Sequence, residues 1–113
     1  MREDTIAAIA TAAGEGGIGI IRISGETALD ILEKVFIPVS GNIKPRVLSY
    51  GHVVDYRDNK VIDEVMAVYM KGPFSYTAED VAEIQCHGSI VSLRKILSLV
   101  LESGARLAER GEF

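Results

Sequence analysis

The chain has 113 residues, of which 48% are hydrophobic and 25% are charged, and its formal net charge is −4. This composition is that of a globular protein and excludes a disordered chain, and the length suits a single domain with one core. Proteins that grip nucleic acid usually carry a basic surplus, so the acidic balance argues against RNA binding by this segment alone. The single cysteine excludes an internal disulfide and favours a reducing, cytoplasmic location. Since no apolar run approaches the length of a membrane span, we expect a soluble protein with no membrane association.

The first half of the sequence predicts two strands followed by a helix. Residues 5–11 and 18–24 are apolar segments that favour buried strands, and a glycine-rich turn at 14–17 separates them. Apolar side chains then recur at helical spacing, which predicts a helix from residue 24 or 25 to about residue 36. Prolines and a glycine within 38–45 predict a loop after this helix.

The second half predicts a hairpin and, after an irregular loop at 74–80, a strand, a helix and a short strand. The hairpin turn is expected at 57–60, where polar residues separate two long segments that favour strands. Gly104 predicts a left-handed cap at the end of the second helix. The expected elements are strands over 47–56, 61–70 and 81–87, a helix from residue 88 or 89, and a strand over 105–108. The order β-β-α-β-β-β-α-β predicts an α+β domain, with one mixed sheet packed by two main helices.

The first glycine cluster has the spacing of a dinucleotide-binding loop, with Gly14, Gly16 and Gly19. In a dinucleotide fold the glycine turn delivers the phosphates to a helix N-terminus, whereas here it leads into a strand. A P-loop is also excluded, because Ile20 and Ile21 stand where Lys and Ser or Thr would be needed. Two interpretations stay open: a tight turn that needs positive φ, or a loop whose missing side chains let a flat ligand approach the backbone.

Cys86 and His87 suggest a nucleophile and its base, but neighbouring residues of a strand point to opposite faces. Cys86 shares its face with Ala82 and Ile84, which predicts a place in the core. His87 and His52 supply too few partners for a metal ion. We therefore assign no catalytic residue and no metal site.

Arg22 and Glu83 are the more informative charges, because each lies on a strand whose other residues are mainly apolar. Burying a charge alone is costly, so each must be paired, hydrogen-bonded or turned toward a ligand. Three interpretations follow from the residues themselves: an internal ion pair between Arg22 and Glu83, two charges that face solvent, or a ligand-binding site.

Six stretches of the sequence carry a family pattern, namely residues 4–11, 14–25, 62–65, 75–88, 104–106 and 110–113. In these stretches the chain resembles the N-terminal domain of the MnmE (TrmE) family of tRNA-modification GTPases. The resemblance covers the whole chain, 1–113, as one domain. Ala12 and Ala13 depart from the family, which usually has two prolines there, and Ala78 and Ser89 stand where glycine is common. None of these departures removes a side chain expected to bind a ligand, and Ser89 can cap the second helix.

The resemblance implies a fold related to the folate-binding domain of the glycine-cleavage T protein, and a homodimer. It also implies that 5-formyltetrahydrofolate binds near the dimer interface as a one-carbon donor. The folate-binding arginine and glutamate of the family fall on Arg22 and Glu83, and a further lysine lies after Phe113. A carboxylate such as Glu83 can accept the paired N–H donors of a reduced pterin, and Arg22 can donate to a ligand carbonyl or carboxylate.

In full-length relatives the resemblance implies GTP hydrolysis with Mg²⁺ and K⁺, and joint action with the flavoprotein MnmG on the wobble uridine of tRNA. The GTPase motifs are absent from this segment, so we expect no GTP hydrolysis from it. Two alternatives stay open: a stand-alone folate-dependent one-carbon transferase, and a dimerisation scaffold that binds no ligand.

Overall fold

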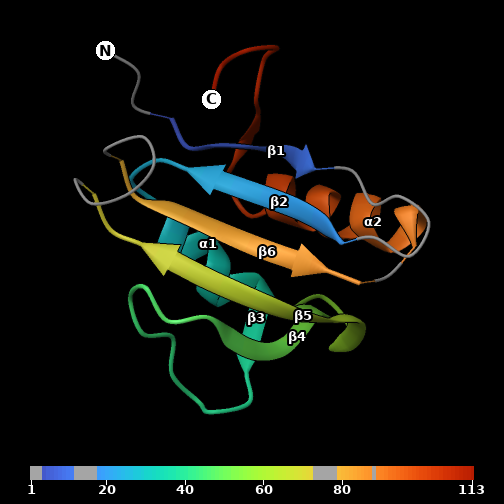
Figure 1. Cartoon of the computed structure of the whole chain (residues 1–113). Coiled ribbons are helices and arrows are strands. Elements are labelled where there is room, and N and C mark those ends of the chain that lie inside the picture. The colour runs from blue at the N-terminus through green and yellow to red at the C-terminus, as the bar shows by residue number, and fades with distance from the viewer. Residues whose placement is uncertain (1–3, 12–17, 73–78, 88) are drawn as a thin grey trace.

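The mixed sheet expected from the sequence is present in the computed structural model, which describes residues 4–11, 18–72, 79–87 and 89–113 (Figure 1). The elements are β1 (Ile6–Thr11), β2 (Gly19–Ser24), α1 (Ala28–Val35), β3 (Phe36–Pro38), β4 (Ser49–Asp55), β5 (Lys60–Met70), β6 (Val81–Cys86), α2 (Ile90–Glu102) and β7 (Arg106–Leu107). The strand order in the sheet is β3-β4-β5-β6-β2-β1-β7. In the part of the chain that is described, no helix is long and apolar enough to cross a membrane.

The sheet is mixed because its last strand runs parallel to its neighbour. β7 pairs parallel with β1, whereas the other neighbouring strands pair antiparallel. β2 and β6 are neighbours in the sheet, although α1, β3 and the β4–β5 hairpin separate them in the sequence. The α+β class with two main helices on one mixed sheet is thus confirmed.

The core lies between the sheet and the two helices, which pack on the same face (Figure 1). Alternate residues of the central strands point into it, among them Ile21, Ile23 and Ile84. Each large apolar side chain buried here contributes about 1.5–3 kcal/mol relative to exposure. The opposite face of the sheet carries no helix from the described residues (Figure 1).

The first helix starts later than the sequence predicts: the expected start at residue 24 or 25 is wrong, whereas the expected end at about residue 36 agrees to within one residue. Gly25 has φ of +143°, and a Cβ there would lie 2.6 Å from the Cα of Thr5. Thr27 then donates its N–H and its hydroxyl to the Thr5 hydroxyl, at 3.1 and 2.7 Å. This packing against the start of β1 delays the helix to Ala28.

The end of the first helix turns directly into a strand that the sequence assigns to the helix and the loop. Phe36 is extended, with φ −120° and ψ 130°, although its N–H still donates to the Leu32 carbonyl. It begins β3, in which Phe36 pairs with Val53 of β4. A three-residue strand is too short to show a hydrophobic period in the sequence, so its pairing with β4 decides its conformation.

Other expectations agree with the structure to within a few residues. The hairpin turn is present between β4 and β5, and Asn59 there has a φ of +61°. The Ser89 hydroxyl caps α2 by accepting the N–H of Ser92 at 3.3 Å, and Gly104 has a positive φ of +126°. The glycine turn at 14–17 and the departures at 12, 13 and 78 lie outside the described residues.

Candidate functional site

Arg22 and Glu83 lie directly opposite each other on β2 and β6. The Arg22 Nε donates to Glu83 Oε2 at 2.8 Å, and the Arg22 Nη2 lies 2.8 Å from the same oxygen. The Arg22 side chain is 29% exposed and the Glu83 side chain 7%. The ion-pair interpretation is therefore confirmed, and the alternative of two charges that face solvent is wrong.

The pair lies on the face of the sheet opposite the helices. Ile21 and Ile84, the adjacent residues, point into the core, so alternation along each strand turns Arg22 and Glu83 the other way. Across the strands, the pair is flanked by one apolar residue on each side. Ala8 of β1 pairs with Arg22, and Val68 of β5 pairs with Glu83, so that the four residues form one row across the sheet. An ion pair bounded by apolar side chains is electrostatically stronger than one in water.

Within this arrangement Glu83 has an oxygen outside the ion pair. Among the described residues, the contacts between Arg22 and Glu83 use Oε2, and Oε1 takes no part in them. Removing one partner of a fully buried pair costs about 3–5 kcal/mol, because the other charge stays desolvated, and the 29% exposure of the Arg22 side chain reduces that cost here. Arg22 consequently holds the Glu83 carboxylate in a fixed orientation.

A second polar contact continues the same face of β2. The Ser24 hydroxyl, two residues beyond Arg22, donates to Glu79 Oε2 at 2.7 Å. Nearby, Asp80 accepts the Gly72 N–H through its side chain at 3.0 Å and the Gly25 N–H through its backbone carbonyl at 2.9 Å. These contacts fix the start of β6 against β2. The sequence analysis missed Ser24 and Glu79, because their pairing spans 55 residues and follows no local pattern.

The end of the chain also reaches this site. The ring of Phe113 has its centroid 6.0 Å from the Arg22 Cζ, at the outer limit of a cation–π contact. Phe113 belongs to a stretch that carries the family resemblance, but no property of the residue itself indicated a contact with Arg22. The structure thus places three side chains together, namely Arg22, Glu83 and Phe113.

Cys86 and His87 do not form a catalytic pair. Cys86 is 1% exposed and lies in the core, as predicted. Burial raises the pKa of the Cys86 thiol to about 12, so the thiol stays protonated at neutral pH and is a poor nucleophile. His87 is exposed at the end of β6. The described residues contain no cluster of three or more His, Cys, Asp and Glu side chains that could hold a metal ion.

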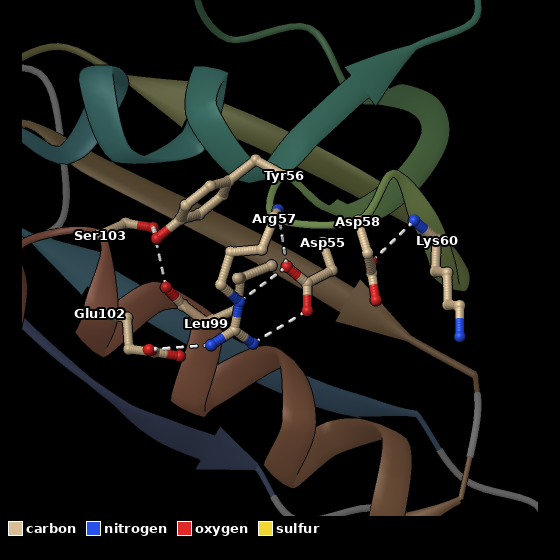
Figure 2. Close-up of polar contacts among 8 residues, drawn as sticks. All are labelled: Asp55, Tyr56, Arg57, Asp58, Lys60, Leu99, Glu102 and Ser103. Atoms are coloured by element: carbon tan, nitrogen blue, oxygen red, sulfur yellow. Dashed lines mark hydrogen bonds and ion pairs between the residues drawn. The ribbon is translucent and has the colours of Figure 1, made fainter.

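A cavity of about 730 Å³ lies away from this pair, between the β4–β5 turn and α2. Arg57 bridges this region by donating to both oxygens of Asp55, at 3.0 and 2.9 Å, and to Glu102 at 3.0 Å (Figure 2). The hydrogen bonds from Arg57 lower the pKa of Asp55 to about 2. Because these charges satisfy one another and tie the turn to the helix, the contacts are structural, and we take the Arg22–Glu83 pair as the candidate site.

Comparison with known proteins gives concordant matches over the whole chain. A family model described as the GTP-binding protein TrmE N-terminus matches residues 5–113. The tRNA modification GTPase MnmE of Clostridioides difficile (strain 630) is 57% identical over 115 aligned positions, which cover 98% of this chain and 25% of that protein. The protein of the same name from Alkaliphilus metalliredigens (strain QYMF) is 56% identical, with the same coverage. The chain spans about a quarter of the length of these curated relatives.

Proposed function

Since the chain belongs to the family of TrmE (MnmE) N-terminal domains, we propose that it binds a tetrahydrofolate, with 5-formyltetrahydrofolate as the one-carbon donor. The observation that carries the proposal is the ion pair of Arg22 and Glu83 on the helix-free face of the sheet. A mostly buried carboxylate beside a guanidinium offers both acceptors and donors, which suits a flat polar heterocycle.

The pair has the chemistry to recognise a reduced pterin. The pyrimidinone edge of a pterin carries adjacent N–H donors, and a charged acceptor binds such donors more strongly than a neutral one. Glu83 Oε1 lies outside the contacts with Arg22, and can accept from that edge. Arg22 supplies the planar fork that matches a ligand carbonyl or carboxylate. The one-carbon chemistry belongs to the folate, whereas these residues bind and orient it.

Homodimer formation is part of the same proposal, and it is supported by exposed apolar side chains at the β3–β4 end of the sheet. Those side chains are Ile37, Val39, Val47, Leu48 and Tyr50. All of them except Ile37 line a shallow cavity of about 410 Å³. Contiguous apolar surface of this kind is typical of a region that a partner covers.

The remaining activities concern the whole protein, of which this chain matches about a quarter. We extend the proposal to GTP hydrolysis with Mg²⁺ and K⁺, to cooperation with MnmG, and to tRNA as the substrate of the complex in the cytoplasm. The fold relation to the folate-binding domain of the glycine-cleavage T protein belongs to the same proposal.

Titration with 5-formyltetrahydrofolate tests the proposal, both in this chain and in one extended through the gene beyond Phe113. Glu83→Gln keeps the size but places an N–H donor against the ligand donors, so we expect affinity to fall by roughly 30-fold or more. Glu64→Gln is the matched control, because the Glu64 side chain is 67% exposed on β5 and lies outside the pair.

Three outcomes separate the proposal from its alternatives. An unchanged dissociation constant for Glu83→Gln, with the fold intact by circular dichroism, would remove the site. One-carbon transfer to an acceptor by the chain alone would favour the stand-alone transferase. Dimerisation without measurable folate binding in the extended chain would favour the scaffold.

A further inference from the structure

Arg106 joins the two ends of the described chain. Its Nε contacts the Asp4 carboxylate, and its Nη1 and Nη2 contact the two oxygens of Glu112. The Nη1 also donates to the Leu107 carbonyl at 3.3 Å. The Glu112 side chain is only 13% exposed. A two-point pairing of guanidinium and carboxylate fixes the orientation of both groups as well as their distance.

Glu112 in turn closes the segment that follows β7. Its Oε1 accepts the N–H of Glu109 at 2.6 Å, and its own N–H donates to the Glu109 carbonyl at 3.0 Å. Gly111, between them, has φ of +76°, which a residue with a side chain rarely adopts. Ala108 anchors the start of the segment by donating its N–H to the Ala7 carbonyl of β1 at 2.9 Å. We call residues 108–112 the closing turn.

The closing turn delivers Phe113 to Arg22. Phe113 comes directly after Glu112, and its ring lies over the Arg22 guanidinium with 6.0 Å between the ring centroid and Cζ. Figure 1 shows the C-terminal segment passing beyond β1 at the edge of the sheet. A ring within about 6 Å of a guanidinium attracts it electrostatically and so favours one orientation of the arginine side chain.

We propose that Arg106 is a positioning residue of the folate site. With Glu112 it holds the closing turn so that Phe113 covers Arg22, and it thereby keeps the Arg22–Glu83 pair oriented toward the ligand. The effect on folate rests on the proposed function, whereas the control of Phe113 by Arg106 does not. Because Arg106 lies at the sheet edge and away from the core, its loss should disturb the turn far more than the fold.

Arg57 provides a matched control for this role. It also pairs with two carboxylates, Asp55 and Glu102, and it is likewise at the surface. Its contacts tie the β4–β5 turn to α2 and include neither Arg22 nor Phe113 (Figure 2). Arg57→Gln thus removes the same kind of interaction at a distance from the proposed site.

The first measurement is the nuclear Overhauser effect between the Phe113 ring protons and the Arg22 side chain. We expect it in the wild-type chain and in Arg57→Gln, and we expect its loss in Arg106→Gln. Arg106→Lys should recover it only in part, because lysine keeps the charge but lacks the fork that pairs with both Glu112 oxygens. An unchanged Overhauser effect in Arg106→Gln would overturn the proposal.

The second measurement is titration of the same variants with 5-formyltetrahydrofolate. Arg106→Gln and Phe113→Ala should each weaken binding by about 10-fold, the scale of one lost oriented contact, whereas Arg57→Gln should not. Loss of the Overhauser effect with unchanged affinity would overturn the role in binding. If the wild-type chain and its extended form bind no folate, the proposed function fails, and the Overhauser effect still decides whether Arg106 positions Phe113.

Discussion

Replacing the Arg22–Glu83 pair with apolar residues tests whether the fold or the ligand requires it. Arg22→Ala leaves Glu83 desolvated and unpaired, which for a fully buried pair costs about 3–5 kcal/mol. Since the Arg22 side chain is 29% exposed, water recovers part of that loss, and we expect about 2–3 kcal/mol. The double variant Arg22→Met with Glu83→Met removes both charges and extends the apolar row of Ala8 and Val68. We expect it to be as stable as the wild type, or more stable by about 1–4 kcal/mol.

The assay is urea unfolding followed by circular dichroism at one fixed protein concentration, because association would shift the apparent stability. With a slope of about 1–3 kcal/mol per molar urea, the single variant should lower the midpoint by roughly 0.7–3 M. The double variant should fold but bind no folate. A double variant as unstable as Arg22→Ala would show that the pair itself stabilises the fold, and retained folate affinity would refute the site.

Four further predictions follow from individual residues. Gly25→Ala should lower the free energy of unfolding in urea by about 2 kcal/mol or more, because the added Cβ would meet Thr5 at a residue with positive φ. Gly41→Ala, also at positive φ but with nothing within 4 Å of the added Cβ, should lower it by about 1 kcal/mol. Cys86 should react with Ellman's reagent only after unfolding, because its buried thiol has a pKa of about 12, and rapid labelling of the native chain would contradict its burial. The chain should sediment partly as a dimer at high micromolar concentration, and a purely monomeric boundary would count against the apolar surface at β3 and β4 as an interface. The 113 residues should hydrolyse no GTP above a buffer blank, since they contain no P-loop.

The strongly patterned elements could be predicted from the sequence, because their residues decide their own conformation. The alternation around Arg22 and around Glu83 placed both residues on strands and assigned Cys86 to the core. The sequence alone offers the ion pair of Arg22 with Glu83 only as one of three interpretations. The pair forms because β2 and β6 are neighbours in the sheet, although the two residues are 61 positions apart in the sequence. That neighbour relation follows from the packing of the whole sheet and from no local signal.

The missed features share this dependence on distant partners. The short strand β3 exists because Phe36 finds Val53, and α1 starts late because Thr27 is held by Thr5. The place of Phe113 over Arg22 requires the closing turn, whose geometry comes from hydrogen bonds with β1 and within the turn itself. Propensity and periodicity describe segments one at a time, so contacts between separate segments escape them.

The parallel pairing of β1 with β7 has a consequence for the order of folding. Ile6 pairs with Arg106, so during synthesis β1 meets its outer partner only about 100 residues later in the chain. Contacts that close such long loops form late and slow the folding reaction. Until then the Thr5 and Ala7 carbonyls, which finally accept the N–H groups of Arg106 and Ala108, lie along an open sheet edge. An open edge can pair with another chain, so deletion of β7 should produce aggregates during synthesis rather than a merely less stable monomer.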